Sequence, residues 1–279
     1  MSVFVVGSLH LDVVLSAPHL PRLDETVTGT SVDYVFGGKG GNQAVAAARL
    51  GADVAFAGRA GSDGFGDMLR AALRQTNVDI SQLQKDDGPS GMSAAIVDAQ
   101  GEYGAVIVSA ANMDIDAAAI KIPAGTRVVL LQNEIPQEVN MAVAEQARAV
   151  GAQIWLNAAP VRDVPDVLAE MLDLMIVNRV EACAYAHPAV PTLETRGKDG
   201  VIFEGVNIAG YPVSIVSAHG AGDMFVGALA ARVAMGQTIA KAIPFAQAAA
   251  ALHVSLPLSE RARLNAEKTA AFLEAQSNR

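Results

Sequence analysis

The sequence predicts an α/β protein in which helices cover both faces of a mainly parallel central sheet. Short β-branched runs alternate with alanine-rich helical stretches through most of the 279 residues, and this alternation is typical of βαβ units. The chain is 51% hydrophobic and 18% charged, which excludes disorder. Its length allows one large domain with a sizeable core. We therefore expect a single α/β domain over residues 1–279.

The apolar runs and the glycines that follow them place the elements of this domain. Segments rich in Val, Ile and Leu predict strands at residues 3–7, 53–58, 126–131, 153–156 and 174–177. Alanine-rich segments predict helices at residues 42–50, 66–76, 138–150 and 223–235. Gly51 and Gly151 follow two of these helices, as glycines at helix C-termini usually do. Trp155 lies in a predicted strand and is expected in the core.

Two segments interrupt this alternation. Residues 25–36 are strand-like with no helix after them, and residues 91–109 have the pattern of a hairpin that turns near Gln100 and Gly101. A small extra β-sheet built from these pieces would stand off the main domain as a lid. We expect the lid segments to cover about residues 9–36 and 91–109.

Composition and termini exclude several classes of protein. The single cysteine, Cys183, rules out an intramolecular disulfide and favours a reducing, cytoplasmic setting. We interpret it as an inert buried thiol, because nothing around it marks it as reactive. The first residues carry no basic leader, and no apolar run approaches the roughly 20 residues of a membrane span. A net charge of −9 argues against a nucleic-acid surface. We expect a cytoplasmic protein without nucleic-acid or membrane partners.

The first motif with chemical content is "FGGKGGNQAVAAARLG", residues 36–51. Its glycines let the backbone turn sharply and approach a ligand closely, so we expect a glycine-rich loop that leads into a buried helix. Lys39 and Asn42 are candidates to hydrogen-bond a polar ligand there. It is not a Walker A loop, because Lys39 is followed by Gly40 rather than Ser or Thr. The first strand leads into "GSLHLD" without a GxGxxG turn, which argues against an NAD-dependent oxidoreductase.

The second motif is "VSAHGAGDMFVGAL", residues 216–229. We expect a strand at 213–216, a turn, and a largely apolar, buried helix that starts at Asp223. A helix N-terminus carries partial positive charge and free N–H groups, and Gly220, Ala221 and Gly222 would leave them accessible as an anion hole. Asp223 then has two interpretations. It caps the helix, or it is a base beside a bound phosphate.

These two motifs together resemble the signature regions of the ribokinase / PfkB family of sugar kinases. The resemblance runs in order through most of the chain, in "VVGSLHLDVV", "DETVTG", "FGGKGGNQAVAAARLGADVAFAGRAGSDGFG", "LNAAP", "GAGDMFVGAL" and "FAQAAAALHV". It implies a ribokinase-like three-layer sandwich with a small β-sheet lid. In the family this lid often mediates dimerisation, so the resemblance is compatible with a homodimer through the lid. It also implies transfer of the γ-phosphoryl group of ATP, with Mg²⁺, to a hydroxymethyl group.

The resemblance assigns roles to individual positions. It implies that Asp223 is the catalytic base and that Gly220, Ala221 and Gly222 form the anion hole. The positions that it implies for the sugar are Asp12, Gly38, Lys39, Asn42 and Glu134. His10 lies where the family usually has Asn, and it is either a ligand contact or a surface residue of the lid. The positions implied for the nucleotide are Asn178, Thr195, Gly197, Gly200 and, at the adenine pocket, Gln247. Glu181 of the NxxE motif is implied in Mg²⁺ placement, through water.

Three departures from the family pattern lie on the nucleotide side. The family often has an Asp that helps to hold a monovalent cation where this chain has Ser217, Ala218 and His219. The C-terminal loop that usually completes that site is replaced by "SLPLSERARLN", residues 255–265. The chain is also shorter, by about one helix, between "EACAYAHP" and "PTLETRG". We therefore expect no monovalent cation site and no strong activation by K⁺.

The leading functional hypothesis is an ATP- and Mg²⁺-dependent sugar kinase that acts on ribose or a similar pentose. A nucleoside kinase or a hexose kinase of the same family remains open, because His10 and the lid set the specificity. A second alternative is a degenerate family member that binds sugar or nucleotide with little catalysis. The departures on the nucleotide side motivate it, and the retained Asp223 and anion hole count against it.

Overall fold

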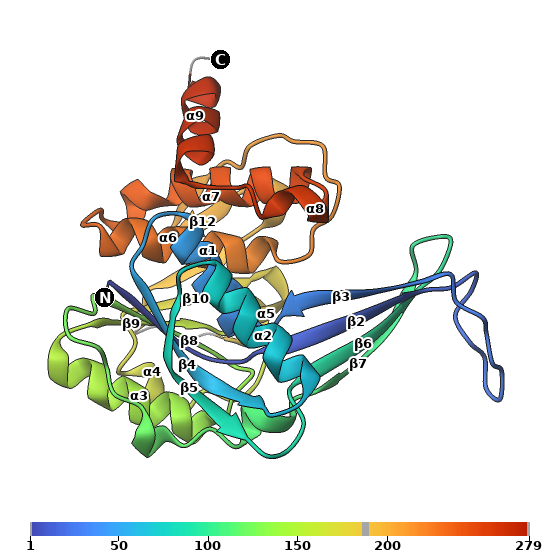
Figure 1. The fold of residues 1–279 in the computed structure, drawn as a ribbon. Coiled ribbons are helices and arrows are strands. Elements are labelled where there is room, and N and C mark those ends of the chain that lie inside the picture. Colours follow the sequence, from blue (N-terminus) through green and yellow to red (C-terminus); the bar gives the residue numbers. More distant parts are fainter. Residues whose placement is uncertain (1, 186–189, 278–279) are drawn as a thin grey trace.

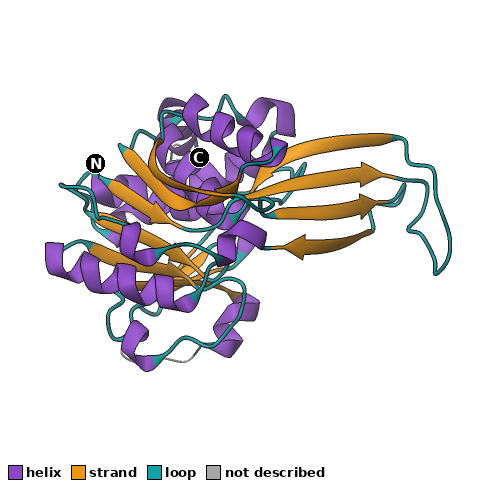
Figure 2. Ribbon diagram, turned by 60° about the horizontal axis from the view of Figure 1, so that its bottom comes forward, coloured by secondary structure: helices purple, strands orange, loops and turns teal. Residues whose placement is uncertain are grey.

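A nine-stranded sheet forms the centre of the computed structural model, which describes residues 2–185 and 190–277 (Figures 1 and 2). The strand order is β13-β12-β11-β10-β9-β8-β1-β4-β5. The strands are β1 (Val3–Val6), β4 (Val54–Gly61), β5 (Asp79–Asp86), β8 (Val128–Gln132), β9 (Gln153–Asn157), β10 (Leu174–Asn178), β11 (Thr192–Thr195), β12 (Val201–Phe203) and β13 (Val206–Ile208). Every pairing from β5 to β11 is parallel, and β12 and β13 add an antiparallel edge. The predicted fold class is confirmed.

Helices cover both faces of this sheet because successive side chains of a buried strand point to opposite sides. In β1, Val3 and Val5 belong to one core cluster, whereas Phe4 and Val6 belong to the other. The first cluster packs against α1 (Lys39–Arg49), α2 (Gly64–Gln75), α6 (Ala221–Ala234), α7 (Ile239–Ser255) and α9 (Ala266–Ser277). The second packs against α3 (Gln137–Val150) and α4 (Asp166–Ala169). Trp155 is fully buried, as predicted.

Short helical elements join these layers. They are α5 (Arg179–Ala184), α8 (Leu258–Arg261) and the 3₁₀ turns η1 (Ala110–Met113), η2 (Ala117–Ala119) and η3 (Gly197–Asp199). None of the helices in the described part of the chain has the length and apolar character that a bilayer crossing needs.

A second, four-stranded sheet projects from the side of the molecule (Figure 1). It consists of β2 (His10–Ser16), β3 (Ser31–Gly37), β6 (Met92–Val97) and β7 (Tyr103–Val108), in the order β3-β2-β6-β7. The hairpin predicted at 91–109 is present as β6 and β7. The first predicted lid strand starts later than expected, at Ser31, because the residues before it form a loop at the tip of the sheet.

The structure corrects several local predictions. Helix α1 begins at Lys39 rather than at residue 42, because Gly40 and Gly41 do not form a loop but pack the helix tightly on the sheet. A Cβ on Gly40 would lie 2.7 Å from the backbone of Gly7, so only glycine allows this approach. The strand predicted at 213–216 is absent: this segment is an irregular, exposed loop with Ile215 58% exposed. Cys183 is exposed, not buried.

Candidate active site

The candidate residues lie at one edge of the central sheet. Ser8 follows β1, Glu134 follows β8, and Asn157, Asn178 and Thr195 end β9, β10 and β11. These strands are parallel neighbours, so their carboxyl ends meet at the same edge, where ligands of α/β proteins bind. Helices α1 and α6 bring further polar side chains to this edge.

Asp223 is buried, with 9% of its surface exposed, in the first turn of α6. It does not cap its own helix: the N-cap is Gly220, and no side chain of the described residues bonds to the free amides there. Instead its carboxylate accepts hydrogen bonds from α1, from Asn42 Nδ2 at 3.3 Å and Gln43 Nε2 at 3.0 Å. The capping interpretation is therefore wrong, and the charge of Asp223 serves a contact between two helices.

Gln43 is a residue that the sequence analysis missed, and its orientation is fixed by its partners. Asn157 Nδ2 donates to the carbonyl of Ile176 at 3.2 Å, so Asn157 turns its Oδ1 toward Gln43. Gln43 must then present its NH₂ group, which gives one proton to Asn157 at 2.9 Å and the other to Asp223. Its Oε1 accepts from Gln132 at 2.9 Å. A chain of buried side-chain amides therefore directs a hydrogen-bond donor at Asp223.

Burial raises the pKa of Asp223 above the ordinary value of an aspartic acid. Loss of hydration is the main cause, and Glu134 adds a smaller repulsion in the same direction. The positive charge of Lys39 and the donors on Gln43 and Asn42 act in the opposite direction. A carboxylate whose proton affinity is raised in this way is a better general base than an exposed one.

The N-terminus of α6 lies open next to this carboxylate. Gly220 has φ 75°, a left-handed conformation that glycine adopts at little cost, and it turns the chain into the helix. The amide of Ala221 donates to the carbonyl of Ala218. Within the described part of the chain, the amides of Gly222 and Asp223 have no hydrogen-bond acceptor. Two N–H groups are thus available at the positive end of the helix dipole.

Glu134 and Lys39 form a second polar group beside α1. Glu134 Oε2 accepts from the Ser8 hydroxyl at 2.5 Å and from the backbone amide of Lys39 at 2.8 Å. Glu134 therefore occupies the N-terminus of α1, which Gly38 caps without a side-chain bond. His10 Nδ1 is 3.9 Å from the same oxygen. His10 is 4% exposed, so its interpretation as a surface lid residue is wrong, and burial lowers its pKa.

Asp12 reaches this region from the small sheet. Its Oδ1 accepts from the hydroxyl of Ser93 on the neighbouring strand at 2.5 Å. Its Oδ2 is 3.9 Å from Nε2 of His219, which precedes α6. The small sheet and the α6 turn therefore face each other across Asp12 and His219.

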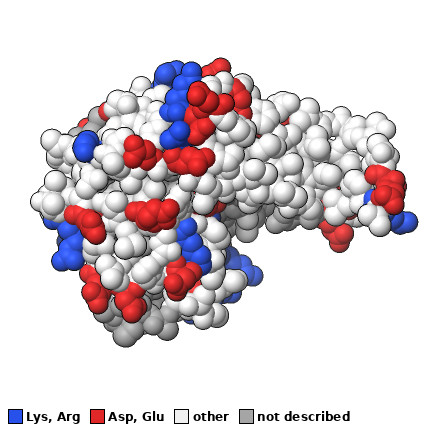
Figure 3. All heavy atoms as spheres, turned by 90° about the horizontal axis from the view of Figure 1, so that it is seen from below, with Lys and Arg blue, Asp and Glu red and all other residues white. Residues whose placement is uncertain are grey.

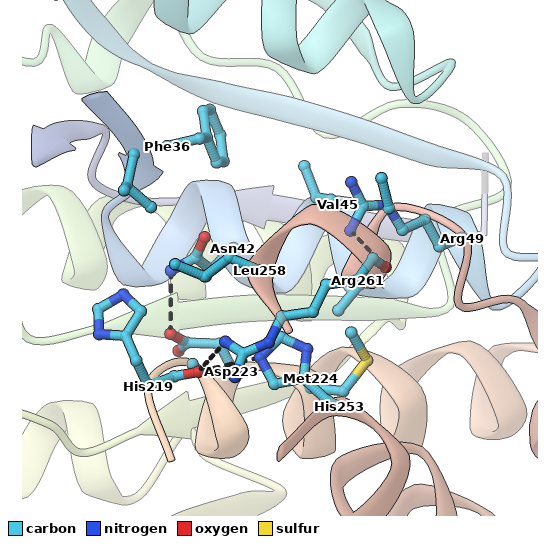
Figure 4. A pocket seen from close by; sticks show the side chains of 14 residues that line it. Phe36, Asn42, Val45, Arg49, His219, Asp223, Met224, His253, Leu258 and Arg261 are labelled. Atoms are coloured by element: carbon cyan, nitrogen blue, oxygen red, sulfur yellow. Dashed lines mark hydrogen bonds between the residues drawn. The ribbon is translucent and has the colours of Figure 1, made fainter. Parts of the chain in front are cut away.

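A cavity of about 210 Å³ opens beside Asp223 (Figure 4). Asn42, Asp223, His219 and Gly220 line one side of it, and Arg49, His253 and Arg261 line the other. His10, Asp12, Lys39 and Glu134 do not line it. Asn42 is therefore the expected acceptor residue that lines this cavity, whereas His10, Lys39 and Glu134 form the neighbouring polar group and Asp12 faces His219.

The residues expected for the nucleotide form a separate group around the start of α5. Asn178 and Glu181 form a reciprocal capping box: the Asn178 side chain accepts from the amides of Val180 and Glu181, and Glu181 accepts from the backbone and side-chain nitrogens of Asn178, both at 2.8 Å. Thr195 lies beside Asn178 in the sheet, and its hydroxyl donates to the carbonyl of Val177.

Gly197, Gly200 and Gln247 lie further along the same edge. Gly197 and Gly200 bound η3 with positive φ values of 59° and 99°. Gln247 Nε2 donates to the carbonyl of Ile208 at 3.0 Å, and Ile208 pairs with the residue after Gly200. The buried Oε1 of Gln247 has no partner among the described residues. Residues 186–189, within the segment expected to be shortened, lie outside the described residues.

Glu181 is the residue that the family resemblance places near Mg²⁺. Each of its carboxylate oxygens already accepts one hydrogen bond from Asn178, and the described residues hold no group of three acidic, His or Cys side chains that would form a protein cage. Mg²⁺ keeps several waters and commonly binds through one or two carboxylates together with substrate phosphates. Glu181 fits an indirect contact of that kind through its remaining lone pairs.

Comparison with known proteins supplies the family context of this geometry. The model of the pfkB family of carbohydrate kinases matches residues 1–261. A ribokinase of Bacillus subtilis is 35% identical over 271 residues, covering 91% of this chain and 92% of the relative. A structure of Arabidopsis thaliana ribokinase, complexed with ribose and ATP, matches with a TM-score of 0.86 at 24% identity and covers 98% of both chains.

A nucleoside kinase of Methanocaldococcus jannaschii, described as an archaeal member of the ribokinase family, has the same fold. It matches with a TM-score of 0.84 at 17% identity over 98% of both chains. Kinases of different acceptors therefore share this architecture, and the fold alone does not select the acceptor.

Proposed function

The chain belongs to the pfkB family of carbohydrate kinases, and we propose that it transfers the γ-phosphoryl group of ATP to a hydroxymethyl group of ribose or a similar pentose. The observation that carries this proposal is the pairing of a buried, amide-supported carboxylate with open helix amides. Asp223 accepts bonds from Asn42 and Gln43 and lies one residue after Gly222, whose amide is unused in the described chain.

In the proposed reaction Asp223 orients the acceptor hydroxyl and takes up its proton. The hydroxyl oxygen forms a bond to the γ-phosphorus as the bond to the β-phosphate oxygen breaks, and ADP leaves with that electron pair. Such phosphoryl transfer depends on positioning and charge stabilisation more than on covalent help. The amides of Gly222 and Asp223 would stabilise the charge on the transferred phosphoryl group. Because the pKa of Asp223 is raised, its carboxylate accepts the proton readily.

Mg²⁺ bound to the triphosphate supplies charge neutralisation, and Glu181 with Asn178 would place it through water. Thr195, Gly197 and Gly200 would contact the phosphates and sugar of the nucleotide, and Gln247 would line the adenine pocket. The orphaned Oε1 of Gln247 supports this last role, because a buried acceptor without a donor is costly.

For the acceptor, Asp12 is suited to two hydrogen bonds from vicinal sugar hydroxyls, and the backbone of Gly38 with Lys39 and Asn42 would hold the rest of the ring. His10 and Glu134 would complete the site. The similarity to proteins named ribokinase over most of the chain favours a pentose over a nucleoside or a hexose. A degenerate, non-catalytic protein is disfavoured because the surroundings of Asp223 are intact.

The proposal predicts that Asp223→Asn lowers turnover by about 10²–10⁴-fold, the usual contribution of a general base. The measurement is ADP release with ATP and Mg²⁺ over a panel of pentoses, hexoses and nucleosides. Asp67→Asn is the matched control, because Asp67 also lies in the first turn of a helix but its side chain is 81% exposed. Unchanged turnover in Asp223→Asn would remove it as the base, and binding without turnover in the wild type would support the degenerate alternative.

We also propose that the small sheet acts as a lid and pairs two subunits in a homodimer, in a cytoplasmic setting. Val106, Ile107 and Val108 of its edge strand β7 are 67%, 63% and 51% exposed. Figure 3 shows the projecting sheet as a largely uncharged surface whose charges gather at its tip. Exposed apolar surface of this kind marks association sites. Sedimentation of the wild type and of Ile107→Lys tests it: a dimer that the substitution dissociates is expected.

A further inference from the structure

Arg261, the last residue of α8, brings an unusual charge to the lining of the cavity beside Asp223. It is 5% exposed, and no carboxylate lies within ion-pair distance of it among the described residues. Buried guanidinium groups are normally paired. Burial accordingly lowers the pKa of Arg261, although a guanidinium remains charged.

Backbone carbonyls take the place of the missing carboxylate. Arg261 Nη2 donates to the carbonyl of Ser217 at 2.7 Å, Nη1 donates to that of His219 at 2.9 Å, and Nε donates to that of Leu256 at 3.2 Å. Figure 4 shows the side chain of Arg261 beside His219 and His253. Three carbonyl oxygens from two separate segments thus converge on one positive charge. Carbonyl oxygens arranged around a point are the usual ligands of a hard cation.

Two of these carbonyls belong to the turn that leads into α6. Residues 213–219 form no regular element. Apart from contacts within the turn itself and those of Arg261 and His253, the described hydrogen bonds that hold it are those from Val216 and Ser217 to a single carbonyl, that of Val254. The next residue, Gly220, is the N-cap of α6. The position of the open amides of Gly222 and Asp223 therefore depends on what holds this turn.

His253 is the neighbour that could share this task, and it contributes no charge. Its Nε2 lies 2.9 Å from the carbonyl of His219. Burial and the neighbouring Arg261 and Arg49 hold its pKa at about 4, so the ring is neutral near pH 7 and donates through Nε2. His219 is the remaining imidazole of the turn, and its ring is directed at Asp12. Among the described residues, the hydrogen bond of the Arg49 side chain goes to the carbonyl of Arg261 itself, at 3.5 Å.

We propose that Arg261 is a positioning residue that acts as a built-in cation, holding the turn of Ser217–His219 so that the helix amides face the reacting phosphate. This inference rests on the proposed kinase function. The C-terminal segment at residues 255–265, which departs from the family pattern, thereby gains a task in positioning this turn. Misplacement of catalytic groups by about 1 Å costs up to about 100-fold in rate, which sets the scale of the expected effect.

The test compares Arg261→Ala with Arg263→Ala, a matched control at an exposed arginine in the same segment. We expect Arg261→Ala to lower kcat by about 10- to 100-fold with a smaller change in the KM of the acceptor, and Arg263→Ala to match the wild type. Millimolar guanidinium, far below denaturing concentrations, should restore part of the lost kcat in Arg261→Ala alone. K⁺ is added in a parallel assay as a second cation for the vacated carbonyl oxygens. Na⁺ or urea should restore less of the kcat of Arg261→Ala than guanidinium does.

Amide hydrogen exchange of residues 216–222 gives a readout independent of turnover. We expect faster exchange of these amides in Arg261→Ala and its reversal by guanidinium. This result does not depend on turnover. If no sugar were phosphorylated, the kinase proposal alone would be overturned. If Arg261→Ala retains the wild-type kcat, or if neither exchange nor kcat responds to guanidinium, the inference is wrong. If Arg261→Ala does not fold, Arg261→Lys replaces it in the test. We then expect partial retention of kcat. Full retention of kcat would count against a need for the two-pronged guanidinium group.

Discussion

Asp223 and Glu181 occupy the same position in two helices of one protein, the third residue after the N-cap, and both are buried at 9% and 7% exposure. Glu181 closes on its own N-cap, Asn178, in a capping box. Asp223 makes no capping hydrogen bond to its own helix in the described structure and instead accepts hydrogen bonds from α1, about 180 residues earlier in the chain. Glu181, bonded to a local partner, stabilises the start of its own helix. Asp223, bonded to a distant helix, leaves the amides at the start of α6 unoccupied, and its carboxylate lies beside them.

The largest effect is expected when the distant partner of Asp223, the amide of Gln43, is removed. Gln43→Leu deprives Asp223 and Asn157 of a donor and leaves the Gln132 amide unpaired. Buried polar groups without partners cost about 1–3 kcal/mol each, and we expect a lower melting temperature together with a drop in kcat of about 10- to 100-fold, in line with loss of positioning. Gln237→Leu, at an exposed glutamine, is the control. Calorimetry and ADP release give the two readouts, and a wild-type kcat in Gln43→Leu would contradict the assigned role.

The dependence of kcat on pH reports the protonation of Asp223 and its dependence on Gln43. The pKa of Asp223 is raised by burial, and protonation removes the proposed base, so kcat should fall as pH falls through a midpoint above the ordinary value of about 3.9. Gln43 is one of the groups that lower this pKa. In Gln43→Leu the acid limb should therefore move to higher pH. A limb that stays in place would mean that another group controls it.

The local acid should tolerate change better than the distant one. Glu181→Gln keeps an acceptor for the capping box, which Gln also forms, so we expect the stability to change by less than about 1 kcal/mol. Its effect should be confined to the nucleotide side, as a higher KM for ATP and for Mg²⁺. An unfolded variant, or one that alters only the KM of the acceptor sugar, would show that the two sides are not separate.

The smallest expected effect concerns monovalent cations. Because the turn before α6 carries no carboxylate at Ser217 and its carbonyls already bind Arg261, K⁺ should leave the wild-type turnover unchanged. Turnover is compared in buffers free of K⁺ and Na⁺, with and without added KCl at constant ionic strength. A large stimulation specific to K⁺ would contradict this expectation.

The sequence predicted the parallel sheet and most of its helices because strands such as Val3–Val6 and the capped helix before Gly151 are specified by neighbours in the chain. Predictions from the sequence were wrong where the structure depends on contacts between residues that are far apart in the chain. Residues 213–216 have the composition of a strand, but among the described residues the sheet ends at β13 and this segment pairs with no strand. Helix α1 starts early because Gly40 packs against Gly7, which local pattern does not reveal.

The candidate site divides in the same way. Asp223, Asn42 and Lys39 stand in motifs and were found from them. Gln43 stands in the same motif, in "GGNQA", but a glutamine in an alanine-rich helix gives no sign that it faces an acid. Arg261 gives no such sign either, because its partners are backbone carbonyls, which no residue pattern reveals.

The amide group of Gln43 has one further consequence, for spectroscopy. Its two protons are fixed separately, one on Asn157 and one on Asp223, and the residue is completely buried. In a nitrogen-15 spectrum these protons should exchange slowly and give two well-separated resonances, one of which follows the charge of Asp223. The protein thus contains a native probe of its proposed base, readable during titration or ligand binding without any chemical label at the site.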